Sequence, residues 1–178
     1  MAEVVLARID DRFIHGQVVT KWLQHVGGCD EILIADDTMD KDPFLQSVMA
    51  MAAPPGINLR VEGVDRAIAH LLSSDPGRGP RILLLMRGPE TALSLLKGGV
   101  PLRQLNVGSM GAAPDRRRLY REISASDEEV ALLQEIEAHG VPVRLQVVPD
   151  SDRGSSLETL LKQRRGAKRN RVTPKSAK

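Results

Sequence analysis

The sequence VVLARIDDRFIHGQ (residues 4–17) joins an apolar run to a cluster of charged residues and then to a glycine at which a helical pattern starts. An apolar run followed directly by an amphipathic stretch is typical of a strand that leads into a helix. The turn between them leaves backbone N–H groups unpaired at the helix start, where anions bind readily. Because the charged cluster contains His15, the segment predicts an anion site that also holds a nucleophile.

Short apolar runs and amphipathic stretches alternate along the rest of the chain. The predicted strands are residues 4–7, 31–35, 58–62, 81–86, 104–107, 117–123 and 141–148. The predicted helices are residues 16–26, 42–53, 64–73, 89–96 and 126–139. This alternation predicts an α/β fold: an open, mostly parallel, twisted sheet of about six to seven strands, with helices on both faces.

The composition narrows the classes of function. Aromatic residues make up only 2% of the chain, which leaves few rings to stack on bases and disfavours nucleic acid as a partner. No run approaches the ~20 apolar residues that a membrane-spanning helix needs. The first residues do not resemble a signal peptide, and Cys29 is the only cysteine. Together these features indicate a cytoplasmic protein.

Charge is distributed unevenly along the 178 residues. Residues 151–178 contain nine Lys or Arg and two Asp or Glu, whereas residues 1–150 contain 16 basic and 21 acidic residues. We therefore expect residues 1–150 to form the folded domain and residues 151–178 to form a basic, disordered tail, with a short helix around Leu157 as one option. Such a tail is either a solvated appendage or a docking segment for an acidic partner, nucleic acid or an anionic membrane.

Polar residues follow several of the predicted strands. In open α/β sheets, ligands bind at the carboxyl ends of the strands. The first strand end supplies the predicted catalytic residues, which are Arg8, Asp10, Arg12 and His15. The other strand ends supply residues expected to line the same crevice, which are Asp36, Asp37, Arg87, Asn106, Gly108 and Ser109. Taken alone, the two neighbouring aspartates among them are most often part of a turn or a helix cap.

These residue types suit phosphoryl chemistry. Arg8 and Arg12 can form charge-assisted hydrogen bonds to phosphate, and the N–H groups near Gly16 and Gln17 can add further donors. An imidazole can attack phosphorus, and a nearby carboxylate can fix its tautomer and orientation. A single histidine near a helix start is, however, usually a capping or surface residue.

Other ligand classes have no motif. His25, His70 and His139 are isolated, and no set of His, Cys and carboxylate residues has the spacing of a zinc site. The segment Gly108-Ser-Met-Gly111 lacks the Walker pattern, and no GxGxxG follows the first strand. We therefore expect no metal and no organic cofactor.

Residues 7–18 resemble the active-site segment of the IIB subunits of the bacterial phosphotransferase system, in the mannose/fructose/sorbose family. The similarity continues, in the same order, through Ala-Pro-Pro-Gly (53–56), Gly-Gly-Val-Pro (98–101) and Leu-Asn-Val-Gly (105–108), and covers roughly residues 4–150. Phe13 stands where leucine is common in that family, and Ser109 where a second glycine is frequent. The basic tail extends beyond the usual end of the family.

The resemblance implies a cytoplasmic protein-N-phosphohistidine–sugar phosphotransferase without a cofactor. It would take a phosphoryl group from a phosphohistidine on a IIA protein onto His15 and pass it to a sugar entering through membrane IIC and IID subunits, with which it would associate peripherally. Arg8, Asp10 and Arg12 match the charged positions around the family's phosphorylated histidine. Two alternatives remain: a regulatory phosphohistidine protein without transport, and a binding domain without chemistry. The sequence leaves a homodimer open.

Overall fold

Seven strands form one sheet, as the alternation predicted. The computed structural model describes residues 2–16, 18–73, 79–150 and 152–163. The sheet runs in the order β3-β2-β4-β1-β5-β8-β9, and each neighbouring pair is parallel except β8 and β9. Its strands are β1 (Glu3–Asp10), β2 (Glu31–Ala35), β3 (Asn58–Glu62), β4 (Arg81–Met86), β5 (Leu105–Ser109), β8 (Val143–Leu145) and β9 (Ser155–Ser156).

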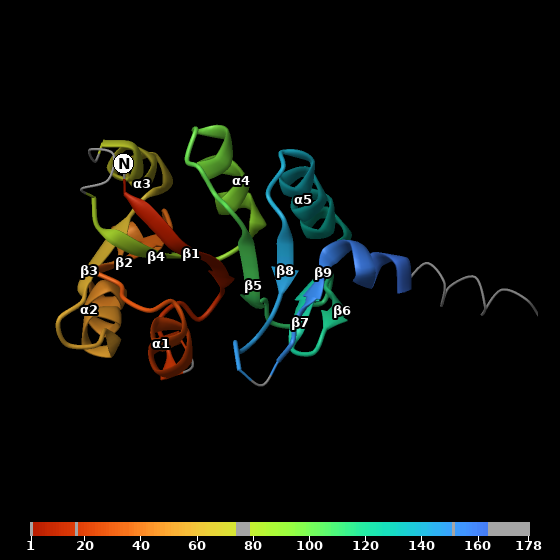
Figure 1. The fold of residues 1–178 in the computed structure, drawn as a ribbon, viewed down its shortest axis with the longest axis horizontal. Helices are drawn as coiled ribbons and strands as arrows, with labels where there is room; N and C mark the ends of the chain where they lie inside the picture. The colour runs from red at the N-terminus through yellow and green to blue at the C-terminus, as the bar shows by residue number, and fades with distance from the viewer. Residues whose placement is uncertain (1, 17, 74–78, 151, 164–178) are drawn as a thin grey trace, which may run out of the picture.

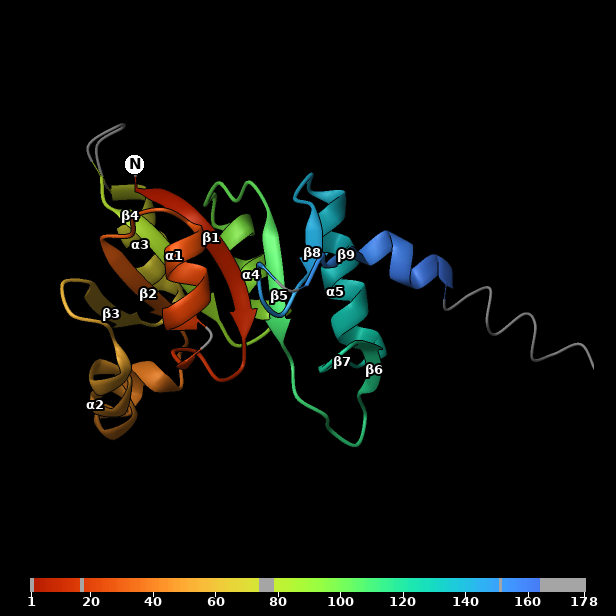
Figure 2. The same ribbon diagram turned by 60° about the horizontal axis from the view of Figure 1, so that its bottom comes forward.

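Helices cover both faces of this sheet (Figures 1 and 2). On one face lie α3 (Val64–Ser73), α4 (Pro89–Lys97) and α5 (Asp127–Ala138). On the other lie a π-helical segment (Val18–Trp22) that continues into α1 (Leu23–His25), and α2 (Pro43–Ala52), which follows a 3₁₀ turn (Met39–Lys41). No helix in the described ranges is long and apolar enough to cross a membrane.

Strand β4 shows why the central strands read as continuous apolar runs. Ile82, Leu84 and Met86 belong to one cluster of buried apolar side chains, whereas Leu83 and Leu85 belong to a second cluster. Successive side chains of a strand point to opposite faces, and here both faces are covered. The sheet is therefore held between two apolar layers.

The carboxyl ends of β1 and β5 lie where the topology reverses. After β1 the chain crosses to β2 and β3, whereas after β5 it continues outward to β8. Asp10 and Ser109, the last residues of the two strands, are register partners. A ligand crevice is expected at such a switch point.

The structure corrects two of the predicted strands. Residues 117–123 form a hairpin, β6 (Arg117–Tyr120) and β7 (Ile123–Ala125), because the chain turns at Arg121, whose φ is 43°. The strand expected over residues 141–148 narrows to β8. It ends early because the N–H group of Val147 donates to Asp152 instead of to a neighbouring strand.

The folded part also extends beyond Asp150, where the tail was expected to begin. Strand β9 pairs with β8, and residues 157–163 are helical, as the short-helix option proposed. Leu157 and Leu160 are buried against the core. The basic composition of this region had suggested a disordered tail, but these two leucines anchor its first part to the core. The remainder of the predicted tail, residues 164–178, lies outside the described residues.

Candidate functional site

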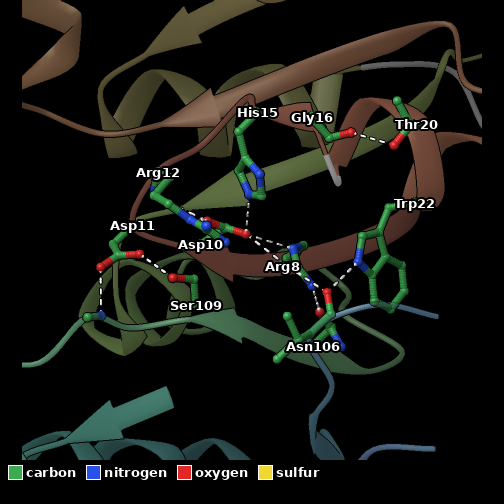
Figure 3. Close-up of polar contacts among 12 residues, drawn as sticks. Arg8, Asp10, Asp11, Arg12, His15, Gly16, Thr20, Trp22, Asn106 and Ser109 are labelled. Atoms are coloured by element: carbon green, nitrogen blue, oxygen red, sulfur yellow. Dashed lines mark hydrogen bonds and ion pairs between the residues drawn. The ribbon is translucent and has the colours of Figure 1, made fainter. Parts of the chain in front are cut away.

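The end of β1 brings Asp10 and His15 into contact (Figure 3). The chain turns tightly after Asp10: Phe13 has a positive φ of 54°, and its N–H group donates to the carbonyl oxygen of Asp10 at 3.0 Å. This turn places His15 Nε2 2.9 Å from Asp10 Oδ2. The His15 side chain is 18% exposed, so the imidazole remains open to solvent.

Arg8 is completely buried behind this pair. Its Nε and Nη2 both donate to Asp10 Oδ2, at 3.2 and 2.8 Å. Its Nη1 donates to Asn106 Oδ1 at 2.5 Å and to the Gln146 carbonyl at 3.2 Å. Its Nη2 also donates to the Val147 carbonyl at 3.2 Å. These five hydrogen bonds use all five N–H groups of a guanidinium.

Two of the expected crevice residues support Arg8 instead. Asn106 is 1% exposed and accepts from the guanidinium. Gly108 is also buried, and a Cβ atom there would lie 1.8 Å from Arg8 Cζ. The structure therefore changes the roles expected of these residues: Asn106 and Gly108 are buried against Arg8, and Arg8 has no donor left for a phosphoryl group.

The neighbouring side chains of this cluster keep the carboxyl group of Asp10 ionised. Burial raises the pKa of Asp10, but its hydrogen bond with His15 and the nearby charge of Arg8 outweigh that effect and leave the pKa below its ordinary value. Burial lowers the pKa of Arg8, against the opposing effect of Asp10, but a guanidinium stays protonated in proteins. An ionised carboxylate can only accept, so His15 Nε2 carries the proton and Nδ1 holds the free lone pair of the neutral ring.

Arg12 lies at the exposed rim of the cluster. Its side chain is 46% exposed, with Nε 3.5 Å from Asp10 Oδ1. Its backbone N–H group donates to the same oxygen at 3.2 Å. Next along the chain, Gly16 is exposed and is the first helical residue after His15, whereas Gln17 lies outside the described residues. Arg12 and this helix start therefore remain available to an anion approaching His15.

The remaining predicted residues form a neighbouring group. Arg87 Nε donates to Asp36 Oδ2 at 2.8 Å, and its guanidinium carbon lies 4.8 Å from the centre of the Phe13 ring. Asp37 accepts from the N–H group of Val64 at the start of α3, which agrees with the alternative of a helix cap. A cavity of about 290 Å³ is lined by Asp36, Asp37, Arg87, Arg116 and Glu129, among others. This crevice contacts the His15 loop through Phe13.

Sequence reasoning missed residues that hold the loops together. Ser109 Oγ donates to Asp11 Oδ1 at 2.6 Å, and Gly111 N donates to Asp11 Oδ2 at 2.7 Å. Asp11 thereby ties the loop after β1 to the loop after β5 (Figure 3). Strand alternation could have pointed to Asp11, because it turns the side chain away from that of Asp10.

Trp22 is the other missed residue. Its position in the helical pattern of residues 16–26 is typical of an apolar face, but its Nε1 donates to the Val147 carbonyl at 3.0 Å. The Arg8 guanidinium carbon lies 4.9 Å from the centre of its ring. No pattern indicates that a carbonyl 125 residues away will be its partner.

Comparison with known proteins gives a consistent result. A family model described as the sorbose subfamily IIB component of the PTS matches residues 4–171. The sorbose-specific EIIB component of Lacticaseibacillus casei is 34% identical over 152 residues, which are 84% of this chain and 92% of that protein. The mannose-specific EIIAB component of Escherichia coli K12 is 27% identical over 88% of this chain and 48% of that longer protein.

A solved structure extends the likeness to three dimensions. The IIB domain of the sorbose permease from Klebsiella pneumoniae superposes with a TM-score of 0.82 at 30% identity, over 90% of this chain and 97% of that domain. The fold, the family match and the level of identity therefore agree with the resemblance seen in the sequence. The chain belongs to the sorbose subfamily of IIB components of the sugar phosphotransferase system, a family of phosphotransferases.

Proposed function

We propose that this IIB component carries a phosphoryl group on His15 Nδ1, accepting it from a phosphohistidine of a IIA protein and donating it to a sugar. The observation that carries the proposal is the contact of His15 Nε2 with the ionised, buried Asp10. That contact leaves Nδ1 as the nitrogen with a free lone pair, on a side chain that solvent reaches.

Each transfer is a displacement at phosphorus. In the first, a bond forms between His15 Nδ1 and phosphorus while the bond from phosphorus to the donor histidine breaks, and the donor nitrogen recovers its lone pair. The ring of His15 becomes positively charged, and Asp10 stabilises that charge through Nε2–H. Arg12 and the N–H groups at the helix start, near Gly16, would balance the charge on the phosphoryl oxygens.

The second transfer returns His15 to its starting state. A sugar hydroxyl oxygen attacks the phosphorus, the bond to Nδ1 breaks, and the hydroxyl proton passes to a base on the membrane subunits or to water. Asp10 is not that base, because its carboxylate is completely buried and both of its oxygens already accept hydrogen bonds. Oδ2 accepts from Arg8 and His15, and Oδ1 accepts from the N–H group of Arg12. Arg8 acts only through Asp10, as a positioning residue.

The expected partners follow from the family. The mannose-specific relative carries EIIA and EIIB in one chain, which supports a IIA protein as the phosphoryl donor. We expect membrane IIC and IID subunits to present the sugar, which belongs to the sorbose, mannose or fructose class. The protein would then work in the cytoplasm, held at the membrane face by those subunits.

Phosphorylation with labelled phosphoenolpyruvate, the general phosphotransferase proteins and a IIA protein tests the proposal. The wild type should acquire one acid-labile label, and His15→Ala should acquire none. His139→Ala is the matched control, because His139 ends α5 at the surface and should not affect labelling. Phosphorus NMR of the labelled protein should show a phosphate on Nδ1. Label on His15→Ala, or on Nε2 of the wild type, would contradict the proposal.

A further inference from the structure

A second cavity, of about 500 Å³, opens where β1 and β5 separate. Strand β1 pairs with β4 from Glu3 onward, but its pairing with β5 starts only at Ala7. The first half of β1 therefore presents a free strand edge on this side, and α1 closes the space from one face of the sheet. The cavity is lined by Val4, Val5, Leu6, Ala7, Trp22, His25, Val26, Arg103, Gln104, Arg144 and Gln146.

The lining carries positive charge without an opposing carboxylate. Arg103, Arg144 and His25 are exposed at the cavity, and none of its lining residues is acidic. Within the described part of the chain, neither arginine forms an ion pair with a carboxylate. Arg144 uses one guanidinium nitrogen to donate to the carbonyl of Arg153, which holds its side chain in place. The cavity is therefore built to attract an anion.

We propose that this cavity binds a small phosphate monoester that carries hydroxyl groups, such as a sugar phosphate. Two guanidinium groups suit the oxygens of a phosphate dianion, with which arginine forms paired, charge-assisted hydrogen bonds. The free edge of β1 and the exposed amide of Gln104 offer donors and acceptors for hydroxyl groups. The volume lies within the roughly 300–1,000 Å³ that is typical of small-molecule sites.

The cavity is separate from the His15 site, but some of its lining residues belong to the network that holds Arg8 in place. His15 is not among the lining residues. Trp22 and Gln146 are, and the Val147 carbonyl that accepts from Trp22 also accepts from Arg8. The Gln146 carbonyl accepts from Arg8 as well. A ligand bound there would contact residues that support Arg8, and its binding does not depend on the proposed function of His15.

Tryptophan fluorescence provides a direct test, because Trp22 is the only tryptophan and is part of the cavity wall. Titration with glucose 6-phosphate should give a saturable change in emission. Inorganic phosphate should bind more weakly, and glucose should give no saturable change. Arg103→Gln and Arg144→Gln should each weaken glucose 6-phosphate binding about tenfold, the usual effect of losing a hydrogen bond to a charged group.

Two controls separate this cavity from other sites. Arg117→Gln, on the exposed strand β6, should bind like the wild type. His15→Ala should also bind like the wild type. Loss of binding in His15→Ala would mean that the ligand occupies the transfer site and would overturn the proposal. So would a missing saturable signal, unchanged affinity in both arginine variants, or equal affinity for phosphate and glucose 6-phosphate.

Discussion

Gly108 lies so close to Arg8 that a Cβ atom on this glycine would sit 1.8 Å from the guanidinium carbon. The missing side chain on β5 thus provides the space in which the arginine of β1 is buried. That arginine holds Asp10, and Asp10 holds His15. The geometry of the candidate site therefore depends on a residue that contacts neither His15 nor solvent.

Gly108→Ala should force Arg8 out of its position. Overpacking of this kind typically costs about 1–3 kcal/mol, so the free energy of unfolding, measured in urea, should fall by about 1 kcal/mol or more. Gly16→Ala is the matched control, because a Cβ atom at this helical residue meets nothing within 4 Å. Equal stability of the two variants would show that Arg8 can move aside without cost.

Arg8→Met should destabilise the protein far more than Arg12→Met. Removing Arg8 leaves Asp10 buried without its cation, a change that costs about 3–5 kcal/mol. Arg12 is half exposed and 3.5 Å from the same carboxylate, and losing such a pair costs about 1 kcal/mol or less. Urea unfolding of the two variants measures the difference, and similar losses would argue against the distinct roles given to the two arginines.

Arg12→Lys should slow phosphoryl transfer while leaving stability nearly unchanged. Lysine keeps the charge but lacks the planar fork that matches two phosphoryl oxygens. Loss of one such donor typically lowers the rate by about 10²–10³-fold, measured here as the initial rate of labelling by the IIA protein. A rate equal to that of the wild type would remove Arg12 from the transfer site.

The stability of the wild type should fall steeply in acid because of Asp10. Its pKa is lower in the folded protein than in the unfolded chain, where it is about 3.9, so the unfolded state takes up protons first as the pH falls. The stabilisation from ionised Asp10 is complete above that value and is lost as the pH falls through the lower, folded pKa. The wild type and Asp10→Asn should therefore differ in unfolding free energy at pH 6, and this difference should begin to shrink only below about pH 4. A constant difference would contradict this linkage.

The periodic elements were predictable from sequence, and the polar network was not. Strand β2 follows from its apolar run. Ser126 and Glu129 have the three-residue spacing of a capping box at the start of α5, and in the structure each side chain accepts from the backbone N–H group of the other residue. These signals are local, because each depends on residues a few positions apart. His15, Asp10 and Arg12 were also recognisable, since the turn after β1 brings neighbours in sequence together.

The depth of Arg8 could not be predicted, because it depends on distant segments. A charged residue is normally expected to end a buried strand, and the first strand was accordingly expected to stop at Ala7. Strand β1 instead continues to Asp10. It can do so because Gly108 leaves room and because the carbonyls of Gln146 and Val147 approach from the far end of the chain. No sequence pattern links Gly108 or the two carbonyl groups to Arg8.

The hydrogen bond between His15 Nε2 and Asp10 also has a consequence for the order in which partners bind. In the proposed function, Asp10 holds that nitrogen, so the donor protein and the sugar would both have to approach Nδ1 from the same side. Because the donor protein and the sugar would compete for the same side of the ring, the first would have to dissociate before the second binds. The kinetics should accordingly show two half-reactions that exchange through a free phosphorylated form, and no complex that contains both partners.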